Sequence, residues 1–300
     1  MKTRIKKVKT KKSFFLRRLL LISIIISTSV LTYTLLTRQN QQEAFGKGDS
    51  SNQVPANTLS STVFNETHHS QALVPESKIS FHAPSNFAGT VVHDVKLNTT
   101  EKYVALTFDD GPWHNSTEQV LKILRQNHIK ATFFMIGQNV KAYPQQAKNV
   151  LAEGHAIGNH TWHHWYMHMN PQLAASEIES TADIIYQTTG AKTTLFRPPG
   201  GILNNGLVEY AKNQNHSTIL WSADSEDYRI PSVSTLIKRA TKVAPGGIVL
   251  MHDGGGNRSH TVTALPQIIS KLRQQGYKFV TVPELLEMQN KEQPPITVKN

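Results

Sequence analysis

Between residues 101 and 282, short apolar runs alternate with longer amphipathic segments, and this alternation restricts the fold more than any other feature of the chain. The runs are rich in β-branched and aromatic residues. Apolar and polar residues do not alternate in them as they do in strands of a sheet with one solvent-exposed face. We place strands at 103–108, 131–136, 155–158, 193–196, 217–222, 247–251 and 278–281. We place helices at 117–125, 144–152, 171–186, 206–212, 232–242 and 262–274.

Strands buried on both faces and joined by helices indicate a parallel sheet. Seven strand–helix units predict an α/β fold, namely a distorted (β/α)7-8 barrel of the TIM type; a doubly wound open sheet is the topological alternative. A domain of nearly two hundred residues buries enough surface to be stable without crosslinks. The chain has no cysteine, which excludes disulfides, thiolate catalysis and cysteine-ligated zinc.

The chain before this domain has a different composition. Of the net charge of +11, nine charges come from cations within residues 1–18, so the remainder carries only +2. Residues 19–36 contain no charged side chain and are just long enough to cross a bilayer as a helix. Residues 38–100 are polar and irregular, although 78–81 and 89–93 can form short strands.

We therefore predict a basic cytoplasmic tail (1–18), a transmembrane anchor (19–37), a flexible extracellular linker (38–100), a catalytic domain (101–288) and a C-terminal tail (289–300). Cations before an apolar segment place the N-terminus inside and the domain outside the cell membrane. Secretion after signal cleavage is the alternative. Because the cations form a tail and the domain is nearly neutral, we expect no nucleic-acid partner.

Polar residues follow the predicted strands at the places where a barrel carries its active site. They are Asp109 and Asp110 after the first strand, His160 to His164 after the third, Arg197 after the fourth, Asp224 to Tyr228 after the fifth and His252 after the sixth. The carboxyl ends of parallel strands meet at one rim, so acids, imidazoles and an arginine should converge there.

Adjacent acids in an extended chain point to different sides, so Asp109 and Asp110 can do different work. Asp110, His160 and His164 offer a divalent metal one carboxylate and two imidazoles, and leave coordination positions open for water and substrate. A metal bound there would activate water and polarise a carbonyl. Taken alone, an Asp-Asp-Gly sequence is more often a turn, and a histidine pair is a moderate signal.

Hydrolysis of an amide also needs a base for the water and an acid for the leaving nitrogen. Asp109 is placed to be the base and His252 the acid. Arg197 can hold Asp109 ionised, and Asp227 can raise the pKa of His252. Taken alone, Arg197 would be interpreted as part of a surface ion pair and His252 as a histidine at the end of a strand. Because polar residues of these kinds follow five of the predicted strands, a catalytic site is the better interpretation.

Five motifs, in order, resemble the polysaccharide deacetylases of carbohydrate esterase family 4, the NodB-homology domain. They cover residues 102–282 and comprise Thr107-Phe-Asp-Asp-Gly111, His160-Thr-Trp-His-His164, Arg197-Pro-Pro-Gly-Gly201, Asp224-Ser-Glu-Asp-Tyr228 and Ile248-Val-Leu-Met-His252. The resemblance implies a distorted (β/α) barrel that removes N-acetyl, or sometimes O-acetyl, groups from sugar polymers. It also implies the roles given above, with Arg197 orienting the base and Asp227 tuning the acid, and a zinc ion that cobalt or manganese can replace.

Two positions depart from the family pattern. Gly200 stands where a tyrosine is common; its backbone N–H can still bind the oxyanion, but a side-chain wall is lost. Tyr228 stands where tryptophan is frequent and still offers an aromatic face to a sugar. Leu250 resembles the apolar wall of the acetyl pocket. Gly200, Tyr228 and Leu250 are therefore our candidate substrate-binding residues.

The anchor and linker would hold the domain between membrane and wall, so we expect a monomer that deacetylates GlcNAc of peptidoglycan. MurNAc, chitin-type and O-acetylated substrates remain open. A protein of another class, an inactive membrane-tethered glycan binder, should have lost a ligand, the base or the acid, and none is missing here.

Overall fold

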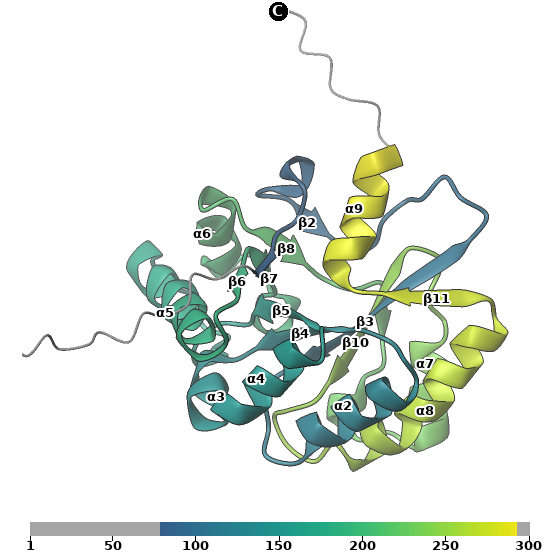
Figure 1. The fold of residues 1–300 in the computed structure, drawn as a ribbon. Coiled ribbons are helices and arrows are strands. Elements are labelled where there is room, and N and C mark those ends of the chain that lie inside the picture. The colour runs from purple at the N-terminus through teal and green to yellow at the C-terminus, as the bar shows by residue number, and fades with distance from the viewer. Residues whose placement is uncertain (1–78, 293–300) are drawn as a thin grey trace, which may run out of the picture. The chain divides into compact units, whose positions relative to one another are not determined.

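The computed structural model describes residues 79–292, which form a parallel sheet flanked by helices (Figure 1). The predicted tail (1–18), anchor (19–37) and most of the predicted linker lie outside the described residues. Within residues 79–292, none of the helices combines the length and apolarity that a bilayer crossing needs.

The main sheet has nine strands, and every strand pair in it is parallel. Its hydrogen-bonded order is β2, β8, β7, β5, β4, β3, β10, β9, and β11 pairs with β3. The bounds are β2 Val91–Val92, β3 Lys102–Asp109, β4 Thr132–Met135, β5 Ala156–Asn159, β7 Leu195–Phe196, β8 Ser217–Ile219, β9 Ala223–Asp224, β10 Gly247–His252 and β11 Tyr277–Val280. A separate parallel pair joins β1 Ser80–Phe81 to β6 Lys192–Thr193.

The sheet curls because one stretch of chain, residues 217–224, contributes β8 near one end of the sheet and β9 at the other end. Strand β8 pairs with β2 and β7, and β9 pairs with β10. The predicted strand 217–222 thus covers only β8 and the bend after it, and β9 begins one residue later. The parallel α/β architecture that the alternation predicted is confirmed, in the form of a curled, barrel-like sheet rather than a flat, doubly wound one.

The predicted seventh strand does not lie between the sixth and the first. Strand β11 pairs with the first half of β3, next to the place where β4 pairs with the second half. Strand β10 pairs with residues 104–109 on the other side of β3. The expected ring of seven or eight strands is therefore wrong in this respect.

The helices pack mainly on the outer face of the sheet (Figure 1). On one flank α8 contacts α2 and α7, and on the other α5 contacts α3, α4 and α6. Their bounds are α2 Ser116–Gln126, α3 Gly137–Ala142, α4 Pro144–Ala152, α5 Pro171–Thr189, α6 Leu207–Asn213, α7 Val233–Ala240, α8 Ser259–Gln274 and α9 Val282–Glu292, with short 3-10 turns η1 Ser85–Phe87, η2 Pro199–Gly201 and η3 Asp227–Arg229.

The period-two alternation of the strands divides β3 between two environments. Val104, Leu106 and Phe108 belong to the outer core beneath the helices. Ala105 belongs to an inner core that α9 covers with Leu285 and Leu286 among other residues. The same alternation turns Thr107 and Asp109, further along β3, to the inside, so the strand itself directs polar groups into the mouth of the curled sheet.

The folded domain extends beyond both predicted boundaries. Phe87, Val92 and Val95 are buried in the inner core, and β1 and β2 pair with strands of the domain, so residues 79–100 are not flexible linker. Their scattered apolar residues are too few to suggest a core by pattern, but they cover inner-face side chains that would otherwise meet water. At the other end, α9 continues to residue 292, past the predicted boundary at 288.

The neighbours Val91 and Val92 test this boundary as a matched pair. Val91 is 41% exposed and Val92 is 6% exposed. We expect Val92→Ala to lower the free energy of unfolding by about 2 kcal/mol, because it removes buried methyl groups and leaves a cavity. Val91→Ala should change it by less than about 0.5 kcal/mol. Equal, negligible effects in chemical denaturation would mean that this segment is a linker after all.

Candidate active site and metal centre

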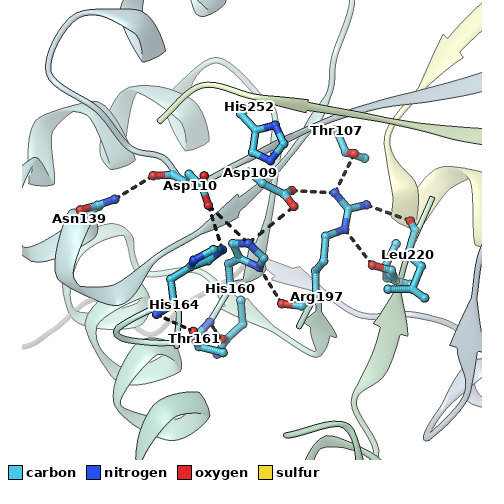
Figure 2. Close-up of polar contacts among 12 residues, drawn as sticks. Thr107, Asp109, Asp110, Asn139, His160, Thr161, His164, Arg197, Leu220 and His252 are labelled. Carbon is cyan, nitrogen blue, oxygen red and sulfur yellow. Dashed lines mark hydrogen bonds and ion pairs between the residues drawn. The ribbon is translucent and has the colours of Figure 1, made fainter. Parts of the chain in front are cut away.

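The polar residues predicted from the sequence meet at the carboxyl ends of the strands (Figure 2). The register of β3 and β10 pairs Asp109 with His252, so the two residues face the same side of the sheet as neighbours. Asp109 is 3% exposed and His252 is 9% exposed. The proposed base and acid thus lie next to each other on adjacent strands, as their roles require.

Asp110, His160 and His164 also converge, with candidate ligand atoms that all lie within 4.8 Å of one another (Figure 2). Asp110 Oδ1 is 3.6 Å from His160 Nε2 and 3.3 Å from His164 Nε2. The backbone of Asp110 has a φ of +69°, so it is left-handed and not extended. The two adjacent carboxylates therefore do not point to opposite sides as the sequence suggested: Asp109 Oδ2 and Asp110 Oδ1 each lie 3.6 Å from His160 Nε2.

The donor set fits a divalent cation. Asp110 Oδ1 is buried and has no hydrogen-bond partner among the described residues, an arrangement that is costly unless a cation is bound. The Nδ1 of His160 lies 2.7 Å from the carbonyl oxygen of Arg197, which can only accept, so Nδ1 carries the proton. The Nε2 lone pair of His160 is therefore free for a metal.

Burial, reinforced by the neighbouring His164, lowers the pKa of His160 to about 3. A ring that stays neutral keeps its lone pair at physiological pH. His160 is thus prepared as a ligand by two independent features, its buried position and the hydrogen bond that fixes its tautomer.

The loop that carries both histidines is held in an unusual conformation. Thr161 and His164 have φ angles of +65° and +62°. Two hydrogen bonds support them: the Thr161 N–H donates to Asn159 Oδ1, and the His164 N–H donates to Thr161 Oγ1. These bonds offset the cost of left-handed backbone at non-glycine residues and aim His164 back toward His160.

A buried carboxylate that the sequence analysis missed, Glu177 of α5, fastens the same loop. Its Oε2 accepts the backbone N–H groups of Trp162 and His163 at 3.0 and 2.8 Å, and its Oε1 lies 2.5 Å from His163 Nδ1. His163, to which the sequence analysis gave no role, therefore helps Glu177 to hold the loop. The sequence held one signal: Glu177 falls on the helix face that Ala174 and Ile178 bury.

Arg197 is fully buried and bonds to the proposed base. Its Nη1 donates to Asp109 Oδ1 at 2.7 Å and to Thr107 Oγ1 at 2.9 Å. Burial raises the pKa of Asp109 and Arg197 opposes that rise, so the net direction is upward. The expectation that Arg197 contacts Asp109 is confirmed. The pKa of Asp109 is nevertheless raised and not lowered, which makes this carboxylate a stronger base.

His252 is paired with Asp227 as predicted. Its Nδ1 is 2.6 Å from Asp227 Oδ1, and its backbone N–H donates to Asp227 Oδ2, which also accepts from Thr261 Oγ1. Although burial favours a neutral ring, the Asp227 carboxylate raises the pKa of His252 to about 9. The imidazole is thus protonated at neutral pH, the state that a general acid needs.

A cavity of about 220 Å³ opens directly above these groups. All three candidate substrate-binding residues, Gly200, Tyr228 and Leu250, line it, together with the proposed base, acid and metal ligands. Tyr166, Trp221 and Asp224 also line the cavity, and the sequence analysis gave none of them a substrate-binding role.

Chemically, this arrangement combines an acidic group, a basic group and a cation site around one small cavity. Each of the seven residues to which we gave a catalytic or ligand role is present, and the structure brings them together. The roles themselves, and the sharing of one ion, stay predictions.

Comparisons with known proteins agree with the geometry. The family model for polysaccharide deacetylases matches residues 96–219. A peptidoglycan-N-acetylglucosamine deacetylase of Bacillus cereus is 44% identical over 201 residues, which are 66% of this chain and 93% of that protein. The solved structure of the Bc1960 peptidoglycan N-acetylglucosamine deacetylase shares 34% identity and a TM-score of 0.63, covering 67% of this chain and 94% of that one.

One further solved structure shows that a similar fold does not by itself establish catalytic activity. Wild-type BA3943 from Bacillus anthracis, described as a pseudoenzyme of carbohydrate esterase family 4, is 31% identical with a TM-score of 0.60. It covers 65% of this chain and 68% of its own. A similar fold is thus compatible with an inactive protein, and the presence of each catalytic side chain has to be established separately.

The hydrogen bonds of Glu177 lead to a prediction about metal affinity. Glu177→Ala should weaken zinc binding by about 10- to 100-fold, because the ligand loop loses three hydrogen bonds that aim both histidines. Glu177→Gln should lie between, since its amide oxygen can still accept from the loop. The exposed Glu179 on the same helix provides the control, Glu179→Gln. Competition with a chromophoric chelator measures the affinities; equal values for all four proteins would exclude a positioning role.

Proposed function

Because this chain belongs to the polysaccharide deacetylase family, we propose that it hydrolyses the N-acetyl groups of peptidoglycan, acting on GlcNAc residues. The observation that supports this most strongly is the complete constellation around one cavity: Asp109, Asp110, His160, His164 and His252. The Bacillus cereus relative, named as a GlcNAc deacetylase, supports the choice of substrate.

A divalent cation, most suitably zinc, would be held by Asp110, His160 and His164 and would acidify water and polarise the acetyl carbonyl. Cobalt or manganese suits the same donors less specifically. Asp109 lies beside this site, with its Oδ2 3.6 Å from His160 Nε2, and accepts the proton of the attacking water. Arg197 holds the other oxygen of Asp109, so the free oxygen faces the cavity.

His252 supplies the second proton transfer. Its Nδ1 is engaged by Asp227, which leaves Nε2 to protonate the amine as the C–N bond breaks. Gly200 and Leu250 line the cavity. In this proposal the backbone N–H of Gly200 binds the developing oxyanion, and Leu250 provides an apolar wall for the acetyl methyl group. After the reaction, Asp109 holds a proton and His252 has lost one, so a second proton exchange with water resets the site.

Two neighbouring activities share this machinery. MurNAc or chitin-type amides, and O-acetyl esters, place the same carbonyl over the same groups, so they differ only in the contacts outside the acetyl pocket. The non-enzymatic alternative, an inactive glycan binder, is disfavoured because no acid, base or candidate ligand has been replaced in this chain.

Acetate release provides the direct test. Protein loaded with zinc should release acetate from GlcNAc oligomers and peptidoglycan, lose activity on chelation and regain it with zinc. Asp109→Asn should reduce kcat by about 100-fold or more, since the base is lost. Asp183→Asn, an exposed acid on α5, is the control and should have no effect. Absence of acetate from every acetylated glycan, with zinc bound, would disprove the activity; release from MurNAc or ester substrates alone would redirect it.

For the location, we propose that residues 19–37 anchor the protein in the cell membrane, with the domain outside, where peptidoglycan lies. Nine cations before this uncharged segment support that orientation. Mass spectrometry of muropeptides tests place and substrate together. Removal of residues 1–37 should abolish deacetylation of the wall in cells while leaving the purified protein active. Unchanged muropeptides would show that the segment is not needed for export.

The Asp227–His252 pair predicts a pH profile. The acid acts while protonated, so activity should fall as pH rises through the pKa of His252, which Asp227 raises to about 9. Asp227→Asn removes the anion and leaves burial, which lowers that pKa. The alkaline limb of kcat/KM should therefore move to lower pH, by on the order of one unit or more. Glu226→Gln is the neighbouring control. An unmoved limb would show that another group is the acid.

A further inference from the structure

The backbone of Gly200 lies against the ring of Tyr166, a residue of the β5–α5 loop. A Cβ atom at position 200 would stand 2.8 Å from Tyr166 Cε1 and 3.4 Å from Cδ1. The shorter distance is below van der Waals contact, so Tyr166 lies in space that a side chain at position 200 would take. Gly200 also has a φ of +60°, which glycine adopts without strain.

The next residue repeats the arrangement with a second ring. A Cβ at Gly201 would stand 2.9 Å from Trp221 Cη2, and Gly201 has a φ of +68°. Tyr166, Gly200 and Trp221 all line the cavity above the candidate metal ligands. The absence of side chains at Gly200 and Gly201 therefore leaves room for two aromatic rings that come from distant parts of the chain.

Tyr166 is held in this place yet remains open to solvent. Its ring meets that of His164 edge to face, with centroids 5.1 Å apart and planes at 85°. Its neighbour Trp165 is stacked on His163 at 4.0 Å, and Glu177 fixes that histidine. Tyr166 is nonetheless 59% exposed, and its hydroxyl has no hydrogen bond recorded among residues 79–292, so its ring is available as a surface.

A second exposed tyrosine stands beside the proposed acid. Tyr228 is 43% exposed, and its ring meets that of His252 edge to face at 5.5 Å. The cavity is thus flanked by one phenol ring next to a candidate metal ligand and another next to the acid. Exposed aromatic rings around a polar cavity are suited to bind the C–H faces of sugar rings, because the ring buries apolar area at little entropic cost.

We propose that Tyr166 determines glycan affinity in this protein: its ring fills the space that Gly200 leaves free and, opposite Tyr228, stacks on a sugar of the bound polymer. The proposal rests on the proposed function, since it names a contact of the same substrate. Tyr166 lines the cavity but is not one of the residues to which we give a proton transfer or a cation contact, so in this proposal it binds a sugar ring and takes no part in the chemistry. It therefore contributes to KM for oligomers and not to the chemistry of a small ester that lacks a sugar.

Substitution of Tyr166 separates these two effects. Tyr166→Ala should raise KM for a GlcNAc tetramer about tenfold with kcat changed less than about twofold, as expected when uniform binding is lost. Tyr166→Phe, which keeps the ring, should behave as the unsubstituted protein. Hydrolysis of an aryl acetate, and zinc content, should be the same in all three. Equal KM values, or an equal loss on the ester, would overturn the proposal.

Gly200→Tyr provides an independent test of whether Tyr166 fills the space beside position 200. In the unsubstituted background the new side chain collides with Tyr166 and should raise KM for the tetramer. In Tyr166→Ala the space is open and only the backbone strain at φ +60° remains, so the same substitution should raise KM by a clearly smaller factor. An equal effect in both backgrounds would show that Tyr166 and position 200 do not share one space.

Binding measured in a protein without turnover separates a failure of the role proposed for Tyr166 from a failure of the proposed function. Calorimetric titration of the tetramer into Asp109→Asn, and into Asp109→Asn with Tyr166→Ala, should show weaker binding in the second by about tenfold. Acetate release with equal affinities would overturn only the role of Tyr166. If the unsubstituted protein releases no acetate, the proposed function fails, and the titration still decides whether Tyr166 binds glycan: equal or absent binding in both proteins overturns it.

Discussion

The buried guanidinium of Arg197 connects the parts of this site more than any other group. Its Nε and Nη2 donate to the carbonyl oxygens of Ile219 and Leu220, where the chain bends between β8 and β9, and its Nη1 donates to Thr107 and Asp109. The Cζ atom of the guanidinium also lies 4.0 Å from the centre of the Phe134 ring. A fully buried cation is tolerable only with pairing of this extent: four hydrogen bonds, one of them to a carboxylate. The curl of the sheet and the orientation of the base therefore depend on the same residue.

The backbone of Arg197 extends this dependence to the cation site. Its carbonyl fixes the tautomer of His160, and its N–H donates to the carbonyl of Asn159, the residue that begins the histidine loop. Glu177 holds the other side of that loop. The proposed base and the proposed ligands are thus positioned by shared neighbours rather than separately, so a change at one is expected to disturb the other.

The sequence predicted the elements whose physical cause is local. The apolar runs became strands near their expected positions, and residues such as Asp109, Asp110 and His252 were found because strand ends meet at one rim. Features that depend on distant partners were missed. The bend after Ile219 follows from pairing with two different strands, and the place of β11 follows from competition for one edge of β3. Likewise, the lost side chain at Gly200 could be read from the sequence, whereas the ring of Tyr166 over it could not, because that contact joins two separate loops.

The central claim is that Asp110, His160 and His164 grip one divalent cation. X-ray absorption spectroscopy of the zinc-loaded protein at the zinc edge measures this most directly. The account predicts one zinc per chain, two imidazole nitrogens at about 2.0–2.1 Å and at least one oxygen ligand, with the imidazole signal reduced to one ring in His164→Ala. Zinc that binds at one per chain without imidazole ligands, or a spectrum unchanged by His164→Ala, would contradict it.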